Sequence, residues 1–487
     1  MSRPRYAILY NLGGQVVPLV VGVLSTPLLL HVLGVERMGV LAIAWLVVGF
    51  SGFLDFGLSR SLTQITAEMS GTREVIRIPA LVWTAVLFAG GLAILGTVAL
   101  LACVGPLLDT LKISAALAPE ARTAFPLFCF SLFPTILSAL LLGIPTAYGR
   151  FGLLNAIRIS SGILLVTGPL LAYWWPENRL GAAMAMLTVV RWVTLAATVW
   201  AVLSTERSLR CYPRFDSALL LRLLTFGSWV TVSNIVSPVL VYCDRFLIGS
   251  LLSVTAVTYY ATPQDAITKV LALPTAIALV LFQQVSRGHR TDPAGAHQQA
   301  RHAIDMTFAG MFPLVLVATA FAPELMTLWL GAEIAAHSWI FLQIFAFGIV
   351  INGLAQIPAT LLQATGRPKW AAFFHVAELV IYAPLLWAGI HWGSLPGAAA
   401  AWSMRIILDA AALFWAVRHT APNGSLLRFR DVIALGAPTL GLLLLVGQAG
   451  LAHRLIVGST LLLGFLWLQR AALLTLARSV RLRPPLA

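Results

Sequence analysis

Charged residues are scarce in this chain of 487 residues. Asp, Glu, Lys and Arg make up 10% of it, and hydrophobic residues make up 59%, whereas soluble domains are about 25% charged. So little polar surface excludes an ordinary soluble protein. Because backbone groups in hydrocarbon must satisfy their own hydrogen bonds, only helices and closed barrels span a membrane. The apolar runs last roughly 20 residues without the alternation of barrel strands, so they predict spanning helices.

Several motifs that carry chemistry are also missing. The sequence has no phosphate-binding G-x-x-x-x-G-K-[ST] and no H-E-x-x-H, and its four cysteines show no paired spacing. The histidines are scattered, and His375 and His391 flank one predicted span without forming a ligand set. We therefore expect no ATP hydrolysis, no metal and no cofactor.

The loops do not fit a membrane enzyme that needs a folded domain outside the membrane. The longest connections, near 103–122, 204–222 and 287–303, are too short to fold alone, although a membrane glycosyltransferase or polymerase needs a sizeable loop with catalytic carboxylates. The predicted outer loops offer only scattered acids: Glu36, Asp109, Glu120, Glu177 and Glu333. A non-enzymatic protein is the expectation.

The apolar runs define about fourteen spans, so the expected fold is an all-α polytopic membrane protein. The expected spans are 8–32, 38–59, 79–102, 123–147, 158–176, 182–203, 223–249, 257–286, 304–330, 338–363, 371–392, 397–417, 432–450 and 455–476.

Basic residues set the orientation and explain the net charge of +14. With a cytoplasmic N-terminus, 23 of the 32 Lys and Arg fall on the cytoplasmic face, and five fall on the other. Those five are Arg37, Lys112, Arg122, Arg179 and Arg454. This asymmetry is the positive-inside pattern, so both termini are expected in the cytoplasm and no nucleic-acid partner is needed.

An internal repeat predicts two pseudo-symmetric lobes. The segments 147–151, 169–171 and 180–185 recur in the same order as 364–368, 384–386 and 396–401. Six spans separate the copies, so the repeats are parallel. We expect a six-helix lobe over 1–210, a second over 211–425, a central cavity between them, and two further helices with a cytoplasmic tail over 426–487.

Charges inside spans are the candidate site residues, because each costs a few kcal/mol unless it is paired or hydrated. The bases, candidates for binding an anionic substrate, are Arg191, Arg245, Lys269 and Arg405. The acids, candidates for ion coupling, are Asp55, Asp244, Asp265, Glu378 and Asp409.

Spacing leaves two interpretations of these charges open. Asp265 with Lys269, and Arg405 with Asp409, stand four residues apart, where side chains meet on a helix. Each pair could simply neutralise itself, or it could serve a ligand. Arg191 has no partner within one turn, so its counter-charge must come from another helix, from water or from a substrate.

The order of several short motifs resembles the bacterial polysaccharide flippases (Wzx-type) of the multidrug/oligosaccharidyl-lipid/polysaccharide exporter superfamily. These motifs are Asn11, Leu33-Gly34 with Gly39, Leu54-Asp55-Phe56-Gly57-Leu58, Asp244-Arg245-Phe246-Leu247-Ile248-Gly249, Tyr259-Tyr260, Leu273-Pro274, Gln363-Ala364-Thr365-Gly366-Arg367 and Gly397-Ala398-Ala399. The resemblance extends to about residue 420, although Gln283 follows Leu281-Phe282 where members often have proline.

The resemblance implies translocation of undecaprenyl-diphosphate-linked oligosaccharide across the bacterial inner membrane by alternating access, for O-antigen or exopolysaccharide synthesis. Membrane lipids, a polysaccharide polymerase and a chain-length regulator are the partners it implies. Two alternatives stay open: a related exporter of lipid II or drugs, and a non-transporting component or enzyme of the assembly machinery.

Overall fold

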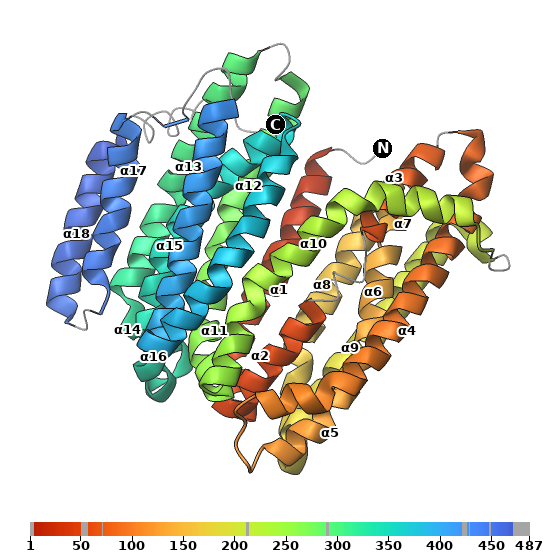
Figure 1. Ribbon diagram of the computed structural model, residues 1–487, viewed down its shortest axis with the longest axis horizontal. Helices are drawn as coiled ribbons and strands as arrows, with labels where there is room; N and C mark the ends of the chain where they lie inside the picture. Colours follow the sequence, from red (N-terminus) through yellow and green to blue (C-terminus); the bar gives the residue numbers. More distant parts are fainter. Residues whose placement is uncertain are drawn as a thin grey trace. The chain divides into compact units, whose positions relative to one another are not determined.

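The computed structural model describes residues 4–49, 57–70, 72–210, 214–288, 292–420, 426–427, 429–447 and 450–470. These ranges contain helices and no strand (Figure 1). The chain divides into two compact units, 1–258 and 259–487. The lobe boundaries expected near 210 and 425 remain predictions.

Each of the fourteen predicted spans overlaps a helix. Up to Leu251 the α-helices are α1 (Pro4–Leu33), α2 (Val35–Gly49), α3 (Leu58–Ser70), α4 (Ile78–Thr110), α5 (Ala118–Cys129), α6 (Leu132–Leu141), α7 (Gly143–Ala147), α8 (Phe151–Thr167), α9 (Arg179–Thr205) and α10 (Ser217–Leu251). The remainder are α11 (Val254–Thr268), α12 (Ala272–Gly288), α13 (Pro293–Ala320), α14 (Ala322–Leu330), α15 (Ala332–Ala364), α16 (Pro368–Thr420), α17 (Phe429–Gly441) and α18 (Leu451–Leu468). Short 3-10 segments join some of them: η2 (Arg73–Arg77), η3 (Gly168–Trp174), η4 (Pro176–Asn178), η5 (Arg207–Arg210), η6 (Lys269–Leu271) and η7 (Leu442–Leu445).

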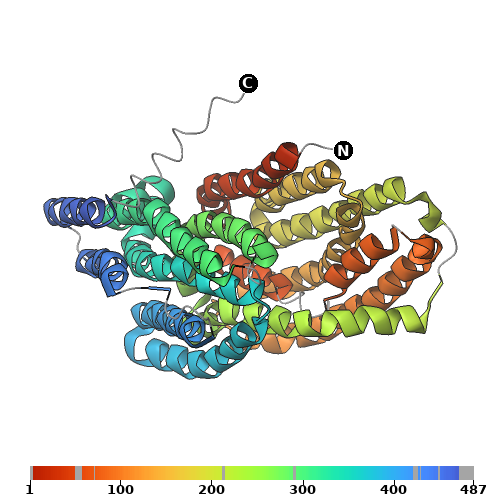
Figure 2. The ribbon, with the colours of Figure 1, turned by 90° about the horizontal axis from the view of Figure 1, so that it is seen from above.

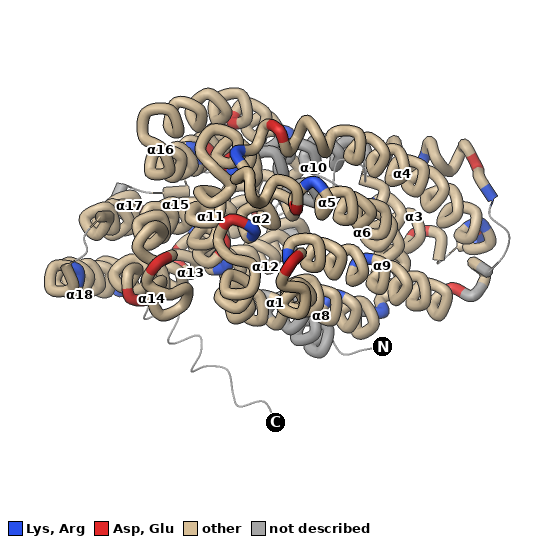
Figure 3. Tube along the Cα trace, turned by 90° about the horizontal axis from the view of Figure 1, so that it is seen from below, with Lys and Arg blue, Asp and Glu red and all other residues tan. Residues whose placement is uncertain are grey.

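Nine stretches of the described residues are long and apolar enough to cross a membrane. They are Arg73–Thr110, Ala118–Ala147, Gly152–Trp174, Pro176–Thr205, Val254–Ser286, Pro293–Ala320, Ala332–Ala364, Phe373–His419 and Leu451–Leu468. Val20–Leu33 and Asp431–Leu445 are shorter apolar helices. Charged residues are sparse along the helices (Figure 3). The prediction of a helical multi-pass membrane protein is confirmed.

The longest helix, α16, is a hairpin of two helices. Its apolar stretch of 47 residues would reach about 70 Å, more than twice the roughly 30 Å of a hydrocarbon core. The chain reverses at Ser394, which has φ 53° and ψ −137°. Beyond the reversal the backbone of Gly397 lies against that of Gly389, so close that a Cβ on Gly397 would stand 1.9 Å from the Gly389 oxygen. We call residues 368–393 the first arm and 395–420 the second arm; they match the eleventh and twelfth predicted spans.

The repeat seen in the sequence has a counterpart in backbone geometry. Gly149 and Gly366 both have positive φ, 68° and 76°. In each case the next residue closes the end of the preceding helix: Arg150 N–H donates to Pro145 O, and Arg367 N–H donates to Leu362 O, both at 2.8 Å. Glycine is favoured at such a helix end because it adopts positive φ without a steric penalty.

Within the second unit, α15 is a central helix that packs against α12, α13, α14 and α16. The helices α17 and α18, drawn in blue at the edge of this unit (Figure 2), are firmly attached to it. Buried Gln343 on α15 donates to Thr319 O at 3.0 Å and accepts from Gly447 N–H at 2.9 Å. The Phe465 ring on α18 stacks on Phe312 with centroids 5.0 Å apart.

A buried arginine near the start of α18 also attaches this helix to the second unit. Arg454 is 1% exposed and forms a bidentate ion pair with Glu324 of α14, with N···O distances of 2.5 and 2.6 Å. It also donates to the Ala320 carbonyl. Arg454 was predicted to be one of the outer loop charges, and its pairing with Glu324 was not predicted.

Candidate functional site

Three of the predicted site residues meet between the two arms of α16. Glu378 lies on the first arm, and Arg405 and Asp409 lie on the second. The Arg405 guanidinium pairs with the Glu378 carboxylate at 3.0 Å, and both side chains are less than one-tenth exposed. Arg405 also lies over the Tyr382 ring, with its Cζ 5.0 Å from the ring centroid. The arms therefore hold a buried charge cluster, defined here as His375, Glu378, Tyr382, Arg405 and Asp409.

The ion pair corrects an expectation from spacing. Arg405 and Asp409 were expected to meet because they are four residues apart, but the carboxylate that Arg405 contacts is Glu378, across the hairpin. Asp409 still interacts electrostatically with Arg405 and with His375. One of its oxygens, Oδ1, is buried without a hydrogen-bond partner in the described part of the chain.

His375 and Tyr382 are the members of the cluster that were not among the predicted site residues. One ligand atom each from His375, Glu378 and Asp409 lie within 4.8 Å of one another. Two carboxylate oxygens and an imidazole nitrogen at this separation could hold a cation. His375 and Glu378 stand three residues apart on one arm, but only the hairpin brings Asp409 to them.

A hollow of about 80 Å³, part of which is open, lies beside the cluster. Glu378, Tyr382, Arg405 and Asp409 line it together with apolar residues of both arms. This volume is smaller than the roughly 300–1,000 Å³ of pockets for drug-sized ligands, and it suits a small ion. The charged groups are thus buried but open onto a space from which a small ion could reach them.

Lys269 and Asp265 occupy a break in a membrane-spanning segment. The helix α11 ends at Thr268, and the 3-10 turn η6 begins at Lys269. Both side chains are exposed. A charged side chain within a span almost always faces protein or a water-filled space rather than lipid, which indicates that Lys269 borders a hydrated path.

The other candidates that the structure describes lie on helices of the first unit. Arg191 on α9 is partly exposed and has no hydrogen-bonding or ionic partner among the described residues. On α10, Asp244 and Arg245 are buried; Asp244 accepts from the Arg245 backbone N–H at 2.7 Å, and the Arg245 Cζ lies 5.5 Å from the Tyr242 ring centroid. Asp55 falls outside the described residues.

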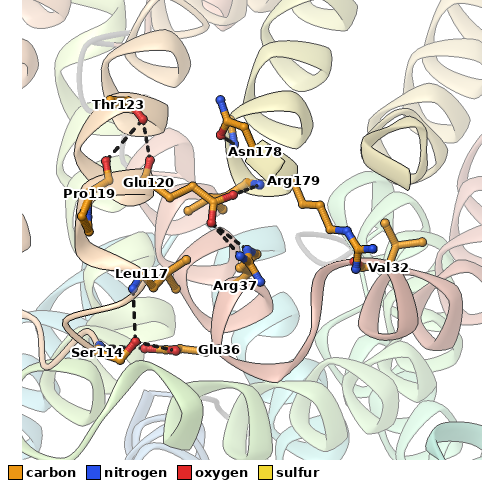
Figure 4. A network of polar contacts seen from close by, with 12 residues as sticks. Val32, Glu36, Arg37, Ser114, Leu117, Pro119, Glu120, Thr123, Asn178 and Arg179 are labelled. Atoms are coloured by element: carbon orange, nitrogen blue, oxygen red, sulfur yellow. Dashed lines mark hydrogen bonds and ion pairs between the residues drawn. The ribbon is translucent and has the colours of Figure 1, made fainter. Parts of the chain in front are cut away.

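Two of the acids predicted in the outer loops of the first unit belong to a structural network (Figure 4). Glu120 at the start of α5 pairs with Arg37 of α2 at 2.8 Å and accepts from Leu180 N–H of α9 at 2.7 Å. Glu36 accepts from the backbone N–H and the hydroxyl of Ser114, at 2.7 and 2.9 Å. These carboxylates join α2, α5 and α9 to one another, and hydrogen bonds occupy both oxygens of each.

Comparison of the sequence with known proteins identifies relatives along most of its length. Residues 28–337 match the family model described as "Polysaccharide biosynthesis protein". A protein of Shigella flexneri named "Putative O-antigen transporter" is 30% identical over 412 residues, which cover 83% of this chain and 96% of that protein.

Solved structures share the fold at low sequence identity. An inward-facing multidrug resistance MATE family transporter of the MOP superfamily has a TM-score of 0.72 at 14% identity, covering 85% of this chain and 97% of that one. The lipid II flippase MurJ, in an inward closed conformation, has a TM-score of 0.71 at 13% identity, covering 96% and 100%. With its helical hairpin, its charges within spans and these relatives, the chain belongs to the polysaccharide biosynthesis protein family and has the fold of the MOP superfamily transporters.

Proposed function

We propose that the protein is a flippase that moves undecaprenyl-diphosphate-linked oligosaccharide from the cytoplasmic to the periplasmic leaflet of the bacterial inner membrane, for synthesis of O-antigen or exopolysaccharide. The observation that carries the proposal is the 30% identity, over 83% of this chain, to the Shigella flexneri protein named "Putative O-antigen transporter". A polymerase and a chain-length regulator would act on the translocated product.

Exposed bases within membrane-spanning helices support this substrate. A diphosphate crossing hydrocarbon needs cationic hydrogen-bond donors on its path. Lys269 is exposed and Arg191 is partly exposed within such helices. Arg405 is held by Glu378, so Lys269 and Arg191 are the bases that we assign to the diphosphate.

The charge cluster of α16 supports coupling to an ion gradient. Arg405 can balance only one of the two carboxylates, Glu378 and Asp409, and an uncompensated charge in a buried site is costly. A single added positive charge would make the cluster neutral. We therefore assign ion coupling to Glu378 and Asp409, and alternating access to the protein as a whole.

The first test is the leaflet distribution of lipid-linked glycan in cells depleted of the protein. Accumulation on the cytoplasmic face with loss of surface polysaccharide is the expected result. Normal translocation with loss of polymer would contradict the proposal and indicate a role in assembly. Arg191→Ala should abolish translocation while the protein still inserts and folds, and wild-type transport by that variant would remove Arg191 from the site.

A further inference from the structure

The central helix α15 has one polar strip on an otherwise apolar surface. Between Phe345 and Ala364, six positions are not fully buried. Two of them are apolar, Ile351 and Ala359, and the other four are Asn352, Gln356, Thr360 and Gln363. All the buried positions in this segment carry apolar side chains, glycine or proline. We call these four polar residues the polar strip.

Helical spacing puts the polar strip on one side of α15. At 3.6 residues per turn the four side chains fall within an arc of about 80°, and they extend over about 16 Å of the helix axis. Lipid-facing positions should be apolar, because an amide without a hydrogen-bonding partner is costly in hydrocarbon. The pattern on α15 is the reverse, since its polar side chains are the accessible ones.

The amides of the polar strip have unused hydrogen-bonding capacity. Gln356 accepts one hydrogen bond, from Thr275 Oγ1 of α12 at 3.1 Å. Asn352 makes none with the described residues. The Thr360 hydroxyl donates to Gln356 O at 2.7 Å, which leaves its oxygen free to accept. Amides and hydroxyls offer both donors and acceptors without net charge, which suits the hydroxyl groups of a neutral sugar.

From this arrangement we infer that the polar strip of α15, with Thr275 of α12, binds the hydroxyl groups of the glycan that the flippase carries. Lys269 precedes Thr275 by six residues on the same spanning segment and would hold the diphosphate. The inference rests on the proposed function and adds where unit 2 contacts the sugar. The polar strip recognises sugar, whereas the bases recognise phosphate, so the two contributions can be separated by experiment.

The test uses the full-length protein in nanodiscs and two probes: undecaprenyl diphosphate without sugar, and the undecaprenyl-diphosphate-linked glycan of the host cell. The wild type should bind the glycosylated probe more tightly. The double variant Asn352→Leu/Gln356→Leu should lose about tenfold or more in affinity for that probe and change by less than about twofold for the bare lipid. The melting temperature of the double variant should stay unchanged. The Gln356 side chain makes a single hydrogen bond with the described residues, and the Asn352 side chain makes none.

A pair of threonine variants supplies a matched control. Thr360 and Thr460 each donate to the carbonyl four residues earlier, at 2.7 and 2.9 Å, but Thr460 lies on α18. Thr360→Val should weaken binding of the glycosylated probe, and Thr460→Val should not.

If the double variant lost affinity equally for both probes, or for neither, the inference would be overturned. The proposed flippase function would still stand. A wild type that binds neither probe would overturn the proposed function and this inference with it. Lys269→Ala should weaken both probes together, which tells loss of phosphate binding from loss of sugar binding.

Discussion

Arg405 illustrates how a single buried side chain depends on its partner. Its guanidinium faces Glu378 at 3.0 Å and the Tyr382 ring at 5.0 Å, while its Nε has no hydrogen-bond partner in the described chain. Removing one member of a buried pair leaves the other charge uncompensated, which costs more than removing both.

We therefore predict that Arg405→Ala lowers the free energy of unfolding by about 3–5 kcal/mol. Adding Glu378→Gln in the same protein should restore part of that loss, because the carboxylate that Arg405 had neutralised is then removed as well. The measurement is a double-mutant cycle of unfolding in detergent. Additive losses would show that the two side chains do not stabilise each other.

Arg454 is a second residue whose contacts predict an effect on stability. Arg454→Met keeps an unbranched side chain but removes the ion pair with Glu324 and the bond to Ala320 O. Because the Glu324 side chain is 47% exposed and remains hydrated, we expect a loss of about 1–2 kcal/mol rather than that of a fully buried pair. A lower melting temperature in detergent checks this, and Glu324→Gln should have a smaller effect in the same direction.

Glu206, at the end of α9, predicts a dependence on pH. Burial raises the pKa of its carboxyl group, but hydrogen bonds from Ser208 and from the Tyr148 hydroxyl outweigh this and hold the pKa below its usual value near 4.5. A group with a lowered pKa in the folded state stabilises that state above its unfolded pKa and loses the contribution as the pH falls through the folded pKa.

Melting temperatures measured from pH 7 down to below pH 4 should therefore fall less for Glu206→Gln than for the wild type. The expected contribution is about 1 kcal/mol, that of a hydrogen bond to a charged group with partial exposure. Parallel curves for the two proteins would show that Glu206 does not contribute. Tyr148→Phe should remove part of the same dependence, because it removes one donor to Glu206.

At the scale of the element, the hairpin α16 contains a strained turn and a close glycine contact. Ser394 adopts positive φ, which costs roughly 1 kcal/mol or more for a residue with a Cβ. Ser394→Gly should raise the melting temperature, or leave it unchanged if the flexibility of glycine in the unfolded chain offsets the gain.

Gly397→Ala should do the opposite. A Cβ there would stand 1.9 Å from Gly389 O, so the two arms would have to separate, at a cost of about 1–3 kcal/mol. Gly393→Ala is a matched control, because a Cβ on Gly393 meets nothing within 4 Å. Equal effects of the two alanines would exclude close packing as the cause.

Individual helices were predictable from the sequence, and their tertiary partners were not. Hydropathy acts over one span at a time, so each expected span overlaps a helix. The ionic partner of Arg405 lies 27 residues away, beyond a turn at Ser394, so local spacing could not identify it. The polar strip of α15 was missed because Asn, Gln and Thr carry no charge. Their signal was the i, i+4 spacing of polar residues within an apolar span, Asn352, Gln356 and Thr360.

At the scale of the whole molecule, the distribution of basic residues predicts which loops face the cytoplasm. Single cysteines at Asp109 and at Glu74, in a protein with its four natural cysteines replaced, should report opposite sides. The Asp109 side chain is 61% exposed, and the Glu74 side chain is 49% exposed. An impermeant maleimide should label Asp109→Cys in spheroplasts and Glu74→Cys only after permeabilisation. The reverse result would invert the topology and exclude cytoplasmic termini.

The hairpin α16 also has a consequence for biogenesis. A membrane-spanning segment leaves the translocon more readily when it carries no uncompensated charge, and a carboxylate or guanidinium at its centre opposes release by about 2.5–3.5 kcal/mol on insertion scales. Glu378 on the first arm has its ionic partner, Arg405, on the second arm, so the first arm alone would enter lipid with an uncompensated carboxylate. The two arms should therefore leave the translocon and enter the bilayer together as one hairpin, with the ion pair already formed.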